Sequence, residues 1–101
     1  MNRLEQQIER ILQNLSLNFT PQFPFKQFTI DFAEPTNKIA VEVQGTYWHN
    51  KLKQKAKDKI KRTTLTKEGW KVIYIWEHTI KNNPQKTAEY LNKEILSRIE
   101  I

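Results

Sequence analysis

Residues 28–44 read FTIDFAEPTNKIAVEVQ, and this stretch decides the fold because it predicts a β-hairpin. Apolar and polar residues alternate over 28–33 and again over 39–44, which is the pattern of strands with one apolar face. The segment between them, Glu-Pro-Thr-Asn, is typical of a turn. Asp31 and Glu42 lie inside the two predicted strands, where carboxylates are depleted and costly to bury. The hairpin therefore carries a pair of acids that would repel each other without a cation between them.

The position of the turn determines which residues of the hairpin face each other. If residues 36–37 are the centre of the turn, Asp31 faces Glu42 and Thr29 faces Gln44. Directly opposed residues point to the same side with Cβ atoms about 4.5–5.5 Å apart, so the two carboxylates can share one Mg²⁺. Glu42 and Gln44 share a face in any register, since they are two residues apart. The alternative is that Asp31 and Glu42 are the solvent face of an alternating hairpin.

Helices are predicted at both ends of the chain. Residues 3–15 carry apolar side chains at helical spacing, at Leu4, Ile8, Ile11, Leu12 and Leu15. Near the other end, Asn83 followed by Pro84 predicts a helix cap and a first helical residue. The helix that begins there is expected to run to about residue 99.

A third helix and a last strand are predicted between the hairpin and the final helix. From about residue 50 to residue 67 the pattern is helical, with Leu52, Ala56, Ile60 and Leu65 on one stripe that we expect to be buried. Gly69 is a helix C-terminal signal. Residues 70–76 form a nearly unbroken apolar run, as expected of a strand covered on both faces.

The predicted order is helix, strand, strand, helix, strand, helix, with a further edge strand near residues 22–27. This order predicts an α/β fold in which a small mixed β-sheet is flanked by helices. The 101 residues suit one small domain spanning 1–101.

The composition favours a folded domain with a polyanionic partner. Hydrophobic residues make up 38 % and charged residues 28 %, and the net charge is +6 with a pI of about 9.7. Such a balance favours nucleic acid, although lysines that merely keep the surface soluble are the alternative. The absence of cysteine excludes disulfides and thiolate metal sites. With neither a signal peptide nor a membrane-length apolar run in the sequence, we expect a cytoplasmic protein and no membrane partner.

Several motifs occur in an order that resembles one group of nucleases. They are the Asp31 strand, Glu42-Val43-Gln44, the stretch Gly45-Thr46-Tyr47-Trp48-His49, a lysine-rich helix, and Gly69-Trp70-Lys71-Val72 continuing to Trp76-Glu77. Together they resemble the PD-(D/E)XK nuclease superfamily, and within it the very-short-patch-repair-like endonuclease branch. The resemblance covers almost the whole chain and implies a restriction-endonuclease-like core.

The resemblance implies a metal-dependent DNA endonuclease that hydrolyses phosphodiester bonds. Asp31 and Glu42 would hold Mg²⁺, with Mn²⁺ as a substitute and the carbonyl of Val43 as a third ligand. Gln44 stands where the superfamily usually has lysine. A neutral amide can orient water or bind a phosphate oxygen, but it supplies no positive charge and is no base.

Two further residues are candidates for the catalytic site. Histidine titrates near neutral pH, which suits His49 as a general base or a phosphate contact. The alternative is a loop histidine bonded to backbone. The relatives' first helix carries an acidic residue at the site, and here Glu5 and Glu9 compete for that role. Glu5 lies closer to the centre of the apolar stripe, although it would also serve as simple charge compensation at a helix N-terminus.

Nucleic-acid contacts are expected beside the predicted metal site. The cations that crowd the lysine-rich helix would contact phosphates, unless they only solvate the helix; they are Lys51, Lys53, Lys55 and Lys57, followed by Lys59, Lys61 and Arg62. Tyr47 and Trp48 would stack on DNA, unless they belong to the core. So small a chain offers little surface for reading bases, so we expect a homodimer or a specificity partner. A non-catalytic nucleic-acid-binding module on the same fold, and a structure-specific or RNA-processing nuclease, are the alternative functions.

Overall fold

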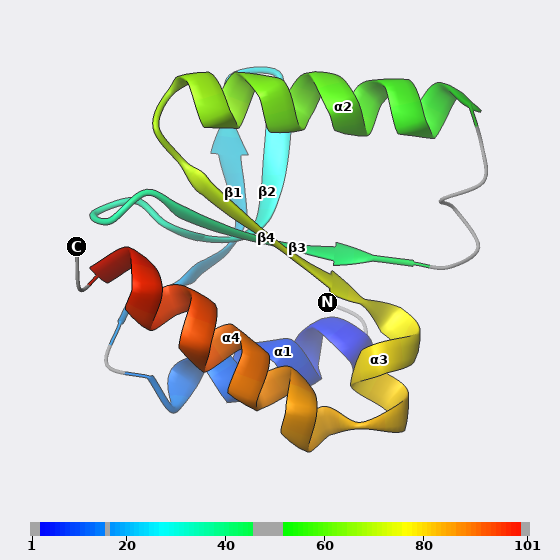
Figure 1. Cartoon of the computed structure of the whole chain (residues 1–101). Coiled ribbons are helices and arrows are strands. Elements are labelled where there is room, and N and C mark those ends of the chain that lie inside the picture. Colours follow the sequence, from blue (N-terminus) through cyan, green and yellow to red (C-terminus); the bar gives the residue numbers. More distant parts are fainter. Residues whose placement is uncertain (1–2, 16, 46–51, 100–101) are drawn as a thin grey trace.

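The computed structural model describes residues 3–15, 17–45 and 52–99, which form a four-stranded sheet between helices (Figure 1). The elements in chain order are α1 (Arg3–Gln13), β1 (Thr20–Phe25), β2 (Phe28–Glu34), β3 (Ile39–Gln44), α2 (Leu52–Lys67), β4 (Lys71–Trp76), α3 (Glu77–Asn82) and α4 (Pro84–Ile99). The predicted α/β class with a mixed sheet is confirmed, and β1 is the edge strand expected near residues 22–27. The predicted order lacked α3. This helix has six residues and a single buried side chain, Ile80, so its sequence is too short to show helical periodicity.

The sheet has the strand order β1-β2-β3-β4. β1 and β2 pair antiparallel, as do β2 and β3, whereas β3 and β4 are parallel and are joined by α2. Glu34 pairs with Ile39 and Phe32 with Val41, so the turn is centred on residues 36–37 as predicted. β3 and β4 consequently end at the same edge, where Gln44 lies beside Trp76.

Helices cover both faces of the sheet (Figure 1). α1, α3 and α4 lie on one face and α2 lies on the other. The first face packs the larger core cluster, which includes Ile8, Leu12, Phe32, Val41, Ile73, Ile75, Ile80, Leu91 and Ile95. The α2 face packs a smaller cluster of Ile30, Ala33, Ala40, Leu65 and Trp70. On this face β4 is only partly covered, because Tyr74 and Trp76 stay partly exposed, so the expectation of a strand buried on both faces was wrong there.

β2 bends at Asp31. Ile30 belongs to the core cluster on the α2 side, whereas Phe32, two residues later, belongs to the cluster on the opposite side. The register of β1 and β2 places Gln22 opposite Asp31, and Gln22 has a φ of 51°, which strand residues rarely adopt. Asp31 is therefore located where the β1–β2 hairpin changes direction.

α2 meets the sheet with a different side from the predicted one. Ala56 is exposed and Ile60 is 55 % exposed, so the predicted apolar stripe was wrong at these positions, although Leu65 is buried. The partly buried side chains four and seven residues before Leu65 are Lys61 and Asp58. This spacing is that of one helix face. α2 therefore presents charged side chains to the sheet along the part that lies over β3 and β4.

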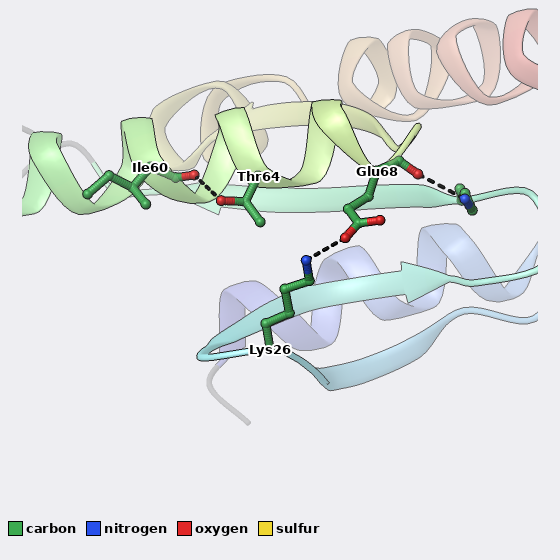
Figure 2. Close-up of polar contacts among 5 residues, drawn as sticks. Lys26, Ile60, Thr64 and Glu68 are labelled. Carbon is green, nitrogen blue, oxygen red and sulfur yellow. Dashed lines mark hydrogen bonds and ion pairs between the residues drawn. The ribbon is translucent and has the colours of Figure 1, made fainter.

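The C-terminal end of α2 contacts both hairpin turns. Gly69, with a φ of 85°, ends the helix as predicted, with its N–H donating to the Thr66 carbonyl at 3.0 Å. Glu68 forms an ion pair with Lys26 in the β1–β2 turn (Figure 2), and its carbonyl accepts a 2.8 Å bond from Lys38 in the next turn. Both hairpin turns therefore hold this end of the helix.

The predicted start of the last helix is confirmed. Asn83 Oδ1 accepts a 3.1 Å bond from the Lys86 N–H, which caps α4, and Leu91 and Ile95 are buried as expected. Within the described ranges, no helix combines the length and apolar character needed to cross a membrane.

Candidate active site

Asp31 and Glu42 face each other where the backbone pairing of β2 and β3 ends. Phe32 and Val41 are the last paired residues on this side, and the same register continued places Asp31 opposite Glu42. Side chains then replace the backbone ladder. The Asp31 N–H donates to Glu42 Oε2 at 2.9 Å, and the Val43 N–H donates to Asp31 Oδ2 at 2.8 Å. Each carboxylate is thus oriented by the backbone of the opposite strand.

Glu42 is a buried acid with only 4 % of its surface exposed. Burial and, after it, the nearby charge of Asp31 raise the pKa of Glu42 to about 7, although the Lys61 ammonium pulls the pKa down. A carboxylate in this state binds a proton or a cation readily. The solvent-face alternative for the pair is therefore wrong for Glu42, which lies on the inner side of the sheet against α2.

Lys61 of α2 reaches this buried carboxylate. Its Nζ forms an ion pair with Glu42 Oε1 and also donates to the carbonyl of Thr29. The Lys61 side chain is only 19 % exposed, which is unusual for a lysine and is tolerated because both contacts satisfy its charge. The ammonium bridges β2 and β3 just beyond the point where their backbone pairing ends.

Glu5 lies on the other side of the carboxylate pair, at a hollow of about 580 Å³. Its Oε2 accepts a 2.8 Å bond from Gln22 Nε2, and Gln22 is the residue opposite Asp31 in the β1–β2 register. The hollow is lined by Arg3, Leu4, Glu5, Asp31, Val43, Gly45, Glu77 and Lys81. Glu9 lines a separate hollow together with Leu12. The structure therefore brings Glu5, and not Glu9, to the side of Asp31.

Gln44 opens into a second hollow of about 400 Å³ between the ends of β3 and β4 and α2. This cationic hollow is lined by Gln44, Lys55, Asp58, Lys59, Arg62, Tyr74 and Trp76. The Arg62 guanidinium lies over the Tyr74 ring, 5.9 Å from its centroid, in a cation–π arrangement. Three cations, the single acid Asp58 and two aromatic rings thus line the hollow beside the Gln44 amide, and the excess of cations together with the rings suits phosphates and bases.

Comparison with known proteins identifies the chain by family. Residues 4–95 match the model of the restriction-endonuclease family REase_MTES_1575. The chain belongs to this family. Membership places it among restriction-endonuclease-like nucleases, which agrees with the PD-(D/E)XK resemblance. The very-short-patch-repair branch stays a prediction, because the family match does not name it.

A solved structure has the same fold as this REase_MTES_1575 member. The match is to the "Homing Endonuclease I-Bth0305I Catalytic Domain", with a TM-score of 0.82 over 98 % of this chain and 99 % of that one. The two sequences are 24 % identical, so the likeness shows the fold alone. Among curated proteins, the search finds no match.

Some predicted site residues of this REase_MTES_1575 member lie outside the described part of the chain. They are Tyr47, Trp48, His49, Lys51 and the side chain of Lys53. Their roles stay predictions. Of the other predicted phosphate contacts, Lys55 lines the cationic hollow, whereas Lys57 is exposed and lines neither that hollow nor the one at Asp31.

Lys59, Lys61 and Arg62 belong to the cationic run that was expected to contact phosphates, but the contact of Lys61 with Glu42 was not predicted. The signal that would have revealed this contact is Leu65, since counting back four residues from this buried position leads directly to Lys61. Periodicity counted only over apolar residues selected Ala56 and Ile60 instead. Because lysines occur at every second position from 51 to 61, they are spread around the helix, and their spacing does not show which of them face the sheet.

Proposed function

We propose that the chain is a Mg²⁺-dependent DNA endonuclease with its metal site on Asp31 and Glu42. The observation that carries this proposal is the opposed carboxylate pair, one member of which is buried, at the open end of β2 and β3. Such a pair is stabilised by a cation. Family membership supports nuclease chemistry, and the net charge of +6 supports a nucleic-acid substrate.

The chemistry of the donors fits the metal. Carboxylate and carbonyl oxygens are the ligands that Mg²⁺ and Mn²⁺ prefer. In the described part of the chain no three His, Asp or Glu side chains are grouped to hold a metal ion, so the proposed set is Asp31, Glu42, the Val43 carbonyl and water. Bound Mg²⁺ would polarise the scissile phosphate and lower the pKa of an attacking water.

The remaining residues have supporting roles in this proposal. Backbone N–H groups hold the Asp31 and Glu42 carboxylates in place, which limits their reorganisation during the reaction. The Gln44 amide orients water or a phosphate oxygen. Lys55, together with Lys59 and Arg62, contacts the DNA backbone from the cationic hollow. His49 remains the proposed general base. Glu5 is proposed as the acidic residue that the first helix contributes beside Asp31.

The test is cleavage of supercoiled plasmid by wild type, Asp31→Asn and Glu89→Gln, each with Mg²⁺, with Mn²⁺ and with EDTA. Glu89 is an exposed carboxylate on α4, so its amide variant is a matched control for the loss of one charge. We expect nicked or linear product with either metal from wild type and the control. Asp31→Asn should lose at least about 100-fold in rate, because a metal ligand is removed.

The alternatives predict other results in the same assay. If wild type binds DNA but cleaves it with neither metal, the chain is a non-catalytic binding module, a reading that the neutral Gln44 favours. Parallel reactions on duplex, branched DNA and RNA separate the structure-specific and RNA-processing alternatives, because a preference for either substrate contradicts simple duplex cleavage.

A further inference from the structure

Lys61 approaches the carboxylate pair from the side toward which a lysine at position 44 would point. Glu42 and Gln44 are two residues apart on β3 and share its α2 face. Lys61 comes from α2 and ends at Glu42 Oε1. The strand thus lacks a cation beside its carboxylate, while the helix packed over it places one there.

A purely structural role does not explain the presence of this buried cation. Replacing a largely buried ion pair by apolar side chains is often neutral or stabilising, so such a pair is weak evidence for a stabilising role. α2 already has an apolar contact at Leu65 and an anchored end at Glu68. Lys61 could therefore have been apolar at little cost to the fold if Glu42 had been apolar as well.

We propose that Lys61 is a catalytic residue that supplies, from α2, the positive charge that Gln44 does not supply from β3. This inference rests on the proposed endonuclease function. In the metal-free chain the ammonium occupies Glu42 Oε1. When Glu42 binds the metal, the flexible four-carbon stem of Lys61 lets its ammonium move to a non-bridging oxygen of the scissile phosphate. There it stabilises the charge that develops during hydrolysis.

The rival role for Lys61 is that of a counter-ion for Glu42. Both roles predict that Lys61→Met melts at a lower temperature without metal, because the variant leaves a buried carboxylate uncompensated. They differ once metal is bound. A counter-ion only competes with the metal, so its removal would tighten metal binding and leave the cleavage rate at saturating metal intact. Loss of a catalytic cation leaves metal binding intact or tighter and lowers that rate.

The experiment measures three quantities for wild type, Lys61→Met, Lys61→Arg and Lys67→Met. These are the Mn²⁺ dissociation constant by calorimetry, the DNA dissociation constant in Ca²⁺, and the single-turnover cleavage rate at saturating Mg²⁺. Lys67 is exposed at the end of the same helix and serves as the matched control. For Lys61→Met we expect metal binding at least as tight as in wild type, nearly unchanged DNA binding, and a rate at least about 100-fold lower. Lys61→Arg should keep part of the rate.

A rescue variant sharpens the test. Gln44→Lys combined with Lys61→Met returns the cation to the strand, and we expect it to recover at least about tenfold in rate over Lys61→Met, which amounts to about 1.4 kcal/mol. If Lys61→Met does not fold, Lys61→Gln takes its place, since its amide can still donate to the Thr29 carbonyl.

The outcomes separate this inference from the function on which it rests. An inactive wild type overturns the proposed function and the role of Lys61 with it. An active wild type with an equally active Lys61→Met at saturating metal overturns only the role of Lys61. A double variant that folds and binds metal but stays as slow as Lys61→Met also overturns it, because the two positions would then not be equivalent.

Discussion

At Glu42 the requirements of folding and of chemistry conflict. A carboxylate that is 4 % exposed would normally be replaced by an apolar residue in a strand as buried as β3. Here it accepts bonds from the Asp31 N–H and from Lys61, and it still lies next to a second carboxylate. Such strain is expected at a functional site, where groups are held in environments that shift their pKa.

The buried state of Glu42 predicts a pH dependence of metal-free stability. The pKa of Glu42 is raised to about 7 in the folded chain, from 4.5, mainly by burial. The folded state therefore binds the proton more tightly than the unfolded state does. This contribution to stability is fully present below about pH 4.5 and is lost as the pH rises through about 7.

Melting temperatures of wild type and Glu42→Gln in EDTA, from pH 4.5 to 8, test this prediction. Glutamine does not titrate at this position, so wild type should lose stability relative to the variant as the pH rises. A difference between the two proteins that stays constant across this range would contradict the raised pKa.

Among the elements, α2 departs most from the usual rule for an amphipathic helix. Its sheet-facing stripe contains Asp58, Lys61 and Leu65, and Ile60 points to solvent. The arrangement is tolerated because the buried Leu65 supplies an apolar contact and the Lys61 charge is paired with Glu42, while Lys55, Lys59 and Arg62 line the cationic hollow. The helix therefore holds cations over the ends of β3 and β4.

This orientation of α2 can be tested with two substitutions on the same helix. Leu65→Ala removes a fully buried side chain and should lower the free energy of unfolding by about 2–5 kcal/mol. Ile60→Ala removes a side chain that is 55 % exposed and should change it by less than about 1 kcal/mol. Urea denaturation measures both values. Equal losses at the two positions would mean that the stripe predicted from apolar periodicity is the buried one after all.

Features that depend on a few neighbouring residues could be predicted from the sequence, whereas features that depend on tertiary packing could not. The register of β2 and β3 follows from a four-residue turn, and the Asn83 cap and the Gly69 terminus are local signals, so all three could be read from the sequence. Which side of α2 faces the sheet is a tertiary property. It could not be predicted, because charged side chains make several of the inward contacts, whereas hydrophobic periodicity considers only apolar residues. The preference for Glu5 over Glu9, by contrast, followed from the position of Glu5 near the apolar stripe of the first helix, and the structure places Glu5, not Glu9, beside Asp31.

For the molecule as a whole, the two sides of the carboxylate pair differ in charge. The α2-side hollow has more cations than acids, because Lys55, Lys59 and Arg62 outnumber Asp58. In the α1-side hollow the acids are in the majority, with Glu5, Asp31 and Glu77 against Arg3 and Lys81. In the proposed function, DNA phosphates bind on the α2 side, and a second copy of the chain or a partner supplies the recognition that so small a surface lacks.

This distribution of charge predicts a specific salt dependence of DNA binding. Each phosphate contact contributes about 0.9 to the slope of log K against log salt concentration. Replacing Lys55 and Lys59 together by glutamine should therefore lower the magnitude of that slope by about 2. Fluorescence anisotropy on a short duplex in Ca²⁺ measures it. The control replaces Lys86 and Lys93 of α4, which lies on the opposite face of the sheet. If both pairs of substitutions lowered the slope equally, DNA binding would depend only on the net charge and not on the position of the lysines.

The contacts of α2 are concentrated toward its C-terminal end. Glu68 contacts Lys26 and Lys38 in the two hairpin turns, and Lys61 pairs with Glu42 of the sheet (Figures 1 and 2). The lysines of the cationic hollow, by contrast, lie on the half of the helix away from these turns. In the proposed function, a duplex bound in that hollow would therefore contact α2 away from the end that the two hairpin turns hold.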